Sequence, residues 1–207
     1  MFVVCRSPKG GVGTSVVAAA IAMCRARAGH RTLLVDLAGD QPELLGVPEP
    51  EFGVGDWLAA GDQAPLDGLR SIEMSVAGQL DLLARGRDVT PERLPVLAEV
   101  LASGQRTVVV DAGVSTDSHW AAGRAEEVVV LRACYLAVRR AGRLSAQTRL
   151  VVIEEPGRAL RVSDVTAAVG VPVWKRLVLD PSVARSVDAG LLGSRLPRSL
   201  RGLDIAA

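Results

Sequence analysis

The residues with the clearest chemical potential form a glycine-rich loop near the start of the chain, Lys9-Gly10-Gly11-Val12-Gly13-Thr14-Ser15. The loop lies between the apolar run 2–5 and an Ala-rich stretch from Thr14, the strand-to-helix setting of a phosphate-binding loop. Glycine tolerates a positive φ, so the backbone N–H groups can turn toward phosphate oxygens. The helix that follows adds unpaired N–H groups and the positive end of its dipole. The Ser15 hydroxyl would bind Mg²⁺. The alternative is a glycine-rich turn without a ligand.

The loop departs from the strict phosphate-loop pattern Gly-x4-Gly-Lys-[Ser/Thr]. Pro8 and Thr14 stand where that pattern requires glycine and lysine. The chain nevertheless places Lys9 in the loop, although it has only two lysines against 22 arginines. Because arginine is the default surface cation here, a lysine inside the loop indicates a local chemical role.

The loop is expected to sit in an alternation of strands and helices. Strands are expected at residues 2–5, 32–36, 80–83, 107–111, 127–131, 149–153 and 171–176. Helices are expected at 14–28, 56–60, 91–103 (with Thr90 as N-cap), 134–144, 162–169 and 181–190. Two strands end in acids, Asp36 and Asp111. This order predicts an α/β fold, a doubly wound and mostly parallel sheet flanked by helices, in a single domain spanning residues 1–207.

Composition limits the function classes. The three cysteines are widely spaced and form neither a disulfide framework nor a metal-binding pair, which favours a reducing compartment. No apolar run near the start is long enough for a signal peptide or a membrane span, so a cytoplasmic location is expected. Residues 196–205 could form a weak amphipathic membrane anchor. Pro197, Gly202 and the shortness of the stretch favour a plain terminal helix, which makes membrane binding an unfavoured alternative.

Charge is distributed unevenly along the chain. Residues 132–207 carry 13 Lys/Arg and six Asp/Glu, whereas the preceding residues have an acidic excess. An arginine-rich part of this kind is consistent with a surface for an acidic partner such as DNA. The competing interpretation is a solvated arginine-rich face.

The loop and the strand motifs together resemble the ParA/MinD family of ATPases. Lys-Gly-Gly-x-Gly is similar to the family's deviant Walker A motif, in which the first lysine, here Lys9, reaches the phosphates of a dimer partner. Leu34-Val35-Asp36 resembles the second motif, with an Asp near Mg²⁺ and the switch region, and Val108-Val109-Val110-Asp111 resembles Walker B. The segment 179–190 resembles the last conserved loop and helix. The resemblance implies a P-loop NTPase of the SIMIBI type that binds ATP and Mg²⁺.

Two positions depart from the family pattern. Thr14 replaces the lysine that contacts the β- and γ-phosphates, and Ala38 replaces a second Asp that helps to place the attacking water. Asp40 lies two residues further on and could substitute for that Asp. Because phosphoryl transfer depends on positioning and charge stabilisation, these losses should impair hydrolysis more than binding.

The resemblance implies the following assignment. Lys9, Gly10, Gly11, Val12, Gly13, Thr14 and Ser15 bind nucleotide; Ser15, Asp36 and Asp111 hold the metal; Lys9 and Asp36 are the catalytic candidates. The expected function is an ATP-dependent, homodimeric switch for intracellular positioning or partitioning, with weak or absent hydrolysis. The Gly-Gly-Val-Gly-Thr-Ser form also resembles the atypical loops of CpaE/TadZ pilus-positioning proteins. The alternative is a nucleotide-free pseudo-ATPase scaffold.

Overall fold

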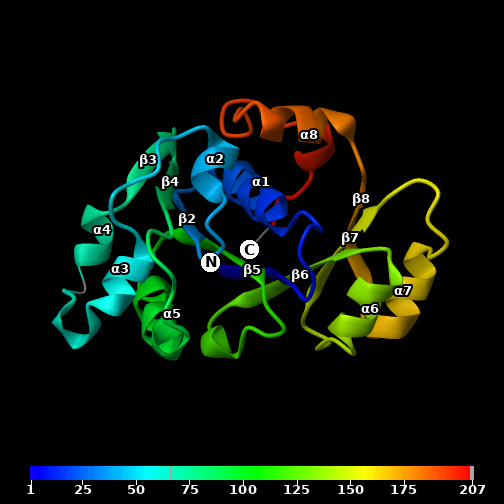
Figure 1. The fold of residues 1–207 in the computed structure, drawn as a ribbon, viewed down its shortest axis with the longest axis horizontal. Helices are drawn as coiled ribbons and strands as arrows, with labels where there is room; N and C mark the ends of the chain where they lie inside the picture. Colours follow the sequence, from blue (N-terminus) through cyan, green and yellow to red (C-terminus); the bar gives the residue numbers. More distant parts are fainter. Residues whose placement is uncertain (66, 206–207) are drawn as a thin grey trace.

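A computed structural model describes residues 1–65 and 67–205. The strands are β1 Phe2–Ser7, β2 Thr32–Asp36, β3 Met74–Ala77, β4 Leu80–Leu83, β5 Thr107–Val114, β6 Glu126–Arg132, β7 Arg149–Glu154 and β8 Val173–Val178. The α-helices are α1 Thr14–Arg27, α2 Gln41–Leu45, α3 Val54–Ala59, α4 Gly68–Ser71, α5 Leu94–Ala102, α6 Tyr135–Ala141, α7 Val162–Val169 and α8 Pro181–Asp188. Figure 1 shows these helices arranged on both faces of one twisted sheet.

The sheet has eight strands in the order β3-β4-β2-β5-β1-β6-β7-β8, and every pairing except that of β3 with β4 is parallel. This confirms the predicted fold class. Strands β2 to β5 all lie on one side of β1, and the chain then crosses over to form β6 to β8 on the other side. The strand order therefore switches direction at β1. In sheets of this kind ligands bind beyond the carboxyl ends of the strands at that switch, which is where the glycine-rich loop follows β1.

Alternation along the central strands divides the core between the two faces of the sheet. Val3 and Cys5 pack on the face covered by α1, whereas Phe2 and Val4 pack against the face covered by α5. A third cluster lies between the outer strands and the helices α6 and α7. Because successive strand residues point to opposite faces, continuously apolar strands are the expected composition of a sheet buried on both sides.

Helix α1 is buried nearly all round, because the sheet covers one side and the C-terminal part of the chain covers the other. Residues 196–205 were expected to form a plain terminal helix, and that prediction is wrong. The structure places only one 3₁₀ turn there, Arg198–Leu200, and buries Leu196, Leu200, Leu203 and Ile205 in the α1 core cluster. An Ala-rich helix that is apolar on all sides must be covered by the sheet on one side and by other parts of the chain on the opposite side. Residues 196–205 form part of the cover on the side opposite the sheet.

The remaining differences from the predicted elements are local. Strand β3 and helices α2 and α4 are short and were not predicted. Strand β8 begins two residues later than expected, and the predicted helix 91–103 starts as a 3₁₀ turn, Pro91–Arg93, in which Thr90 makes no side-chain cap. No helix within the described residues combines the length and the apolar character needed to cross a bilayer.

Candidate functional site

The glycine-rich loop connects β1 to α1 and has the open backbone that the sequence predicts. Gly11 and Gly13 adopt φ values of 72° and 95°, which only glycine accepts without strain. A Cβ atom built at either position would meet no atom within 4 Å, so the space beside the loop is free. Gly13 is the N-cap of α1, and the first turn of the helix therefore presents its unpaired N–H groups beside the loop. Val12 is buried and anchors the loop in the core.

A cavity of about 870 Å³ opens beside this loop. Its wall is formed by the loop and the start of α1, the turn from β2 into α2, the end of β5, and the C-terminal end of α8. Gly10, Gly11, Gly13, Thr14 and Ser15 all line it. The structure therefore brings most of the predicted nucleotide-binding residues to one cavity, whose volume suits a nucleotide-sized ligand.

Two predicted loop residues do not line the cavity, Lys9 and the buried Val12. The Lys9 Nζ donates a hydrogen bond of 3.2 Å to the carbonyl of the adjacent Gly10 and is exposed. Ser7 fixes the backbone here, since its hydroxyl donates to the Lys9 carbonyl at 3.0 Å and accepts from the Lys9 N–H at 3.2 Å. Lys9 is not part of the cavity wall as far as the structure describes the chain. Within one copy of the chain, this lysine does not replace the cation that Thr14 lacks.

Asp111, on β5, is fully buried and is held by Gln41, the first residue of α2. The Gln41 Nε2 donates to Asp111 Oδ2 at 2.8 Å and to the Ser15 carbonyl at 3.0 Å, while the Gly113 N–H donates to Asp111 Oδ1 at 3.0 Å. Burial raises the pKa of Asp111, and the bonds from Gln41, Ser15 and Gly113 oppose that rise. Gln41 thus links the predicted Walker B acid to the start of α1.

Asp36, at the end of β2, lies beside Asp111 in the parallel register of β2 and β5 and is also fully buried. Both of its oxygens accept backbone hydrogen bonds, Oδ1 from Ala38 at 2.9 Å and Gly39 at 2.6 Å, and Oδ2 from Gln41 at 2.9 Å. Burial raises the pKa of Asp36 to about 6, with a smaller contribution from Asp111, against the lowering effect of these N–H groups. Its observed role is to fix the turn that delivers Asp40 and Gln41.

Asp40 lines the cavity, as expected of a residue that could substitute for the missing acid at Ala38. The Ser15 hydroxyl donates to Asp40 Oδ2 at 3.3 Å. The other acids of the cavity wall are Glu43 and Asp188, and no arginine or lysine belongs to this wall in the described part of the chain. The charge beside the phosphate loop is therefore acidic, apart from the N–H groups of the loop and helix.

Ser15 and Asp40 of the cavity wall offer oxygen ligands to a hydrated Mg²⁺ ion, whereas Gln41 is fully buried and does not belong to the described wall. The Gln41 amide uses both of its N–H groups on acceptors, which fixes its orientation and leaves Oε1 buried with no hydrogen-bond partner among the described residues. A buried acceptor of this kind calls for a donor, which metal-bound water would supply. The described residues contain no group of three His, Cys, Asp or Glu suited to a metal by itself. A Mg²⁺ ion at Ser15 would therefore take most of its ligands from phosphates and water.

Gln41 is the residue that sequence reasoning missed. It follows Asp36 by five positions, outside the Leu34-Val35-Asp36 motif, and it is the first residue of a short helix that was not predicted. The sequence feature that could have indicated Gln41 is the turn before it. An acid at a strand end, Asp36, followed by Gly39 and Asp40, indicates a tight turn into a new helix or strand.

Strand order and loop geometry define the class of protein as an α/β fold with a glycine-rich loop between β1 and α1 at the switch point. No protein-family model and no curated protein matches the sequence. Among solved structures, a ParA family ATPase from Chlorobium tepidum TLS superposes with a TM-score of 0.80 at 21% identity, covering 98% of this chain and 94% of that one. MinD from Aquifex aeolicus gives 0.79 at 18%, with the same coverage. MinD complexed with Mg-ADP from Pyrococcus horikoshii OT3 gives 0.76 at 16%, covering 98% and 92%. The chain has the ParA/MinD fold.

Proposed function

We propose that this protein binds ATP together with Mg²⁺ in the phosphate-loop cavity and dimerises as a slowly hydrolysing or non-hydrolysing switch in intracellular positioning or partitioning. The observation that carries the proposal is the open loop at Gly11 and Gly13, joined through Gln41 to the buried pair Asp36 and Asp111. The MinD structure with Mg-ADP supports the choice of ligand through its shared fold. A cytoplasmic location and the CpaE/TadZ-like loop form part of the same proposal.

The acidic wall explains why Mg²⁺ is central to this proposal. Triphosphate oxygens entering the cavity would approach Asp40, Glu43 and Asp188 with no arginine or lysine in the described wall to offset them. Loop N–H groups and the dipole of α1 supply only partial positive charge. When bound, Mg²⁺ supplies the charge neutralisation that Thr14 does not. Ser15, which lines the cavity, would hold it, whereas the buried Asp111 and Gln41 do not belong to the described wall and would act on the ion only through water.

Slow or absent hydrolysis follows from the same residues. Thr14 is neutral, Ala38 has no carboxylate, and Lys9 rests on the Gly10 carbonyl. Phosphoryl transfer requires charge stabilisation and a positioned water molecule, so the monomer lacks two of the groups on which it depends. Dimerisation would offer Lys9 a phosphate in the partner copy. These departures also favour the alternative, a nucleotide-free scaffold that keeps the fold for protein contacts.

The test is calorimetric titration with ATP, with and without Mg²⁺, on the native protein and on Thr14→Lys. We expect binding in the phosphate-loop cavity to require Mg²⁺, so it is measured as the part of the ATP binding that disappears when Mg²⁺ is withheld. In Thr14→Lys, binding with Mg²⁺ should tighten by about tenfold to a hundredfold, because a charge-assisted hydrogen bond contributes roughly 1.5–3 kcal/mol.

The control is Thr166→Lys, which adds the same charge on α7, remote from the cavity wall. It should leave the affinity unchanged. Absence of binding at millimolar Mg-ATP in both the native protein and Thr14→Lys would refute the proposal in favour of the scaffold.

A further inference from the structure

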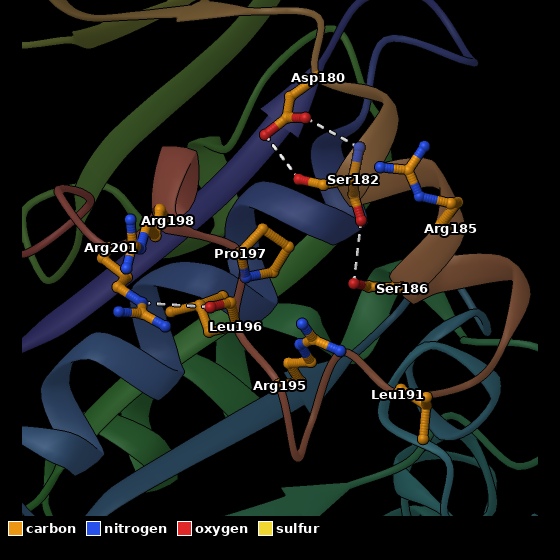
Figure 2. A pocket seen from close by; sticks show the side chains of 10 residues that line it. All are labelled: Asp180, Ser182, Arg185, Ser186, Leu191, Arg195, Leu196, Pro197, Arg198 and Arg201. Atoms are coloured by element: carbon orange, nitrogen blue, oxygen red, sulfur yellow. Dashed lines mark hydrogen bonds between the residues drawn. The ribbon is translucent and has the colours of Figure 1, made fainter.

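A second cavity, of about 740 Å³, lies on the other side of α8, between this helix and the segment 191–201. We call it the arginine cavity, because Arg185, Arg195, Arg198 and Arg201 line it. Figure 2 shows Arg185 on the α8 side, Arg198 and Arg201 on the opposite side, and Arg195 with Pro197 between them. Side chains from two separate segments therefore surround one hollow.

None of these four arginines has an ion-pair partner within residues 1–65 and 67–205. Other arginines of the basic C-terminal part do have one: Arg132, Arg149, Arg158 and Arg176 each pair with a glutamate. The arginine cavity thus gathers four of the cations of this part of the chain that form no ion pair within the described residues. Guanidinium groups in this arrangement are suited to multiply charged anions.

Asp180 is the only acid of the described wall, and its carboxylate is already engaged. Oδ1 accepts from the Ser182 N–H at 2.8 Å, and Oδ2 accepts from the Ser182 hydroxyl at 2.7 Å and the Ser199 hydroxyl at 2.6 Å. No arginine nitrogen lies within ion-pair distance of it among the described residues, so Asp180 does not neutralise the four guanidinium groups. Arg201 Nε donates to the Leu196 carbonyl at 3.2 Å, which leaves its two terminal nitrogens for a ligand.

The shape of the arginine cavity favours a small molecule over a long polymer. Its volume is within the range of small-molecule sites, about 300–1,000 Å³. Leu191, which is 48% exposed, joins Leu196 and Pro197 in giving it an apolar wall. An apolar wall with guanidinium planes suits a ring system attached to phosphates, because arginine both stacks on rings and binds phosphate bidentately.

Helix α8 keeps the two cavities apart. Ser182, Arg185 and Ser186 line the arginine cavity, whereas Val187, Asp188 and the following Gly190 line the phosphate-loop cavity. A ligand in one cavity is thus bounded by different residues from a ligand in the other. The difference allows each site to be removed by mutation without touching the wall of its neighbour.

We propose that the arginine cavity is a second ligand site, which binds a small organic polyphosphate of the nucleoside polyphosphate class independently of the phosphate loop. This site goes beyond the proposed ATP switch and does not depend on it. The ligand's phosphates meet Arg185, Arg195, Arg198 and Arg201, and its ring lies on the apolar wall.

The experiment is titration with tripolyphosphate and with ATP in the absence of divalent cations, conditions under which the acidic phosphate-loop cavity is not expected to bind them. The native protein is compared with the double variant Arg195→Glu/Arg198→Glu. The matched control is Arg139→Glu/Arg140→Glu, which reverses two exposed arginines of α6 and changes the net charge equally. We expect the cavity variant to bind at least tenfold more weakly, about 1.4 kcal/mol, and the control to bind within twofold of the native protein.

A third variant, Gly13→Asp, separates this site from the phosphate loop by placing a side chain and a negative charge where φ is positive. It should abolish Mg-ATP binding in the first cavity and leave binding of metal-free tripolyphosphate unchanged. Circular dichroism establishes that each variant is folded.

Equal weakening in the cavity variant and in the control would overturn the proposal, because it would reflect net charge alone. Loss of tripolyphosphate binding in a folded Gly13→Asp protein would also overturn it, by assigning the anion to the phosphate loop. Duplex DNA or anionic phosphatidylglycerol vesicles that bind through these arginines, when tripolyphosphate and ATP do not, would replace the small molecule with a polymer or a lipid surface. Failure of Mg-ATP to bind would refute only the proposed switch.

Discussion

The two cavities on either side of α8 differ in the groups that they offer to an anion. The phosphate-loop cavity offers main-chain N–H groups and a helix dipole, while its described charged side chains, Asp40, Glu43 and Asp188, are all acidic. The arginine cavity has four guanidinium groups and no glycine-rich loop. Backbone donors depend on a particular loop conformation, whereas side-chain charges depend only on which segments come together. The phosphate-loop cavity, which the sequence motif identifies, would therefore need a bound cation such as Mg²⁺ to hold a polyphosphate, because its wall has no arginine or lysine among the described residues.

The largest expected effect in this comparison concerns the segment that forms the wall of the arginine cavity. Leu203 is fully buried in the α1 core cluster, just beyond that wall. Replacing it in Leu203→Ala should lower the free energy of unfolding by about 2–5 kcal/mol, through lost burial and the cavity left behind. The change in the free energy of unfolding is measured by urea denaturation.

The control for this change is Leu136→Ala, on α6, where the side chain is 52% exposed. It should change the free energy of unfolding by less than about 0.5 kcal/mol. Similar small effects for both variants would mean that residues 196–205 do not pack on α1, and the arginine cavity would lose one wall.

A smaller effect is expected where the phosphate-loop cavity meets the buried acids. Gln41→Leu removes the amide that donates to Asp111 and leaves one oxygen of a buried acid without its partner. The free energy of unfolding should fall by about 1–3 kcal/mol. The matched control is Gln147→Leu, at an exposed position, which should be nearly neutral. If the two variants were equally stable in urea, Gln41 would not be the link between Asp111 and the start of α1.

The smallest effect concerns Asp180 in the arginine cavity. The Ser199 hydroxyl, followed by Ser182, holds the pKa of Asp180 at about 2, below its ordinary value of 3.8. Its favourable contribution to stability is therefore present above pH 3.8 and is lost as the pH falls through about 2. Ser199→Ala should raise this pKa toward 3.8, as measured by carboxyl carbon NMR during an acid titration.

The comparison variant for Asp180 is Ser194→Ala, whose hydroxyl donates to the Leu191 carbonyl instead. It should leave the Asp180 titration where it is. An unchanged pKa in Ser199→Ala would show that Ser199 does not hold the carboxylate. Asp180 would then be free to pair with an arginine of the arginine cavity.

Much of the fold could be predicted from the sequence because its signals are local. The Val- and Leu-rich runs identify all seven strands that pair in parallel to within three residues, and α7 was predicted with its observed ends. The short elements β3, α2 and α4 were missed, since four to five residues carry too little periodicity to be distinguished from loops. The C-terminal segment was mistaken for a helix because its leucines have helical spacing, yet they are buried around a 3₁₀ turn.

The sequence by itself determined the glycine-rich loop between strand and helix, the acids at the ends of β2 and β5, and the absence of the loop lysine at Thr14. Each depends on residues adjacent in the chain, whose conformations follow from local sterics. Only the tertiary structure decided that Gln41 holds Asp111, that Lys9 lies outside the cavity, and that four arginines from two segments share a second one. The bond from Gln41 to Asp111 and the two cavity walls join separate segments of the chain, so they exist only once the sheet and α8 are packed together.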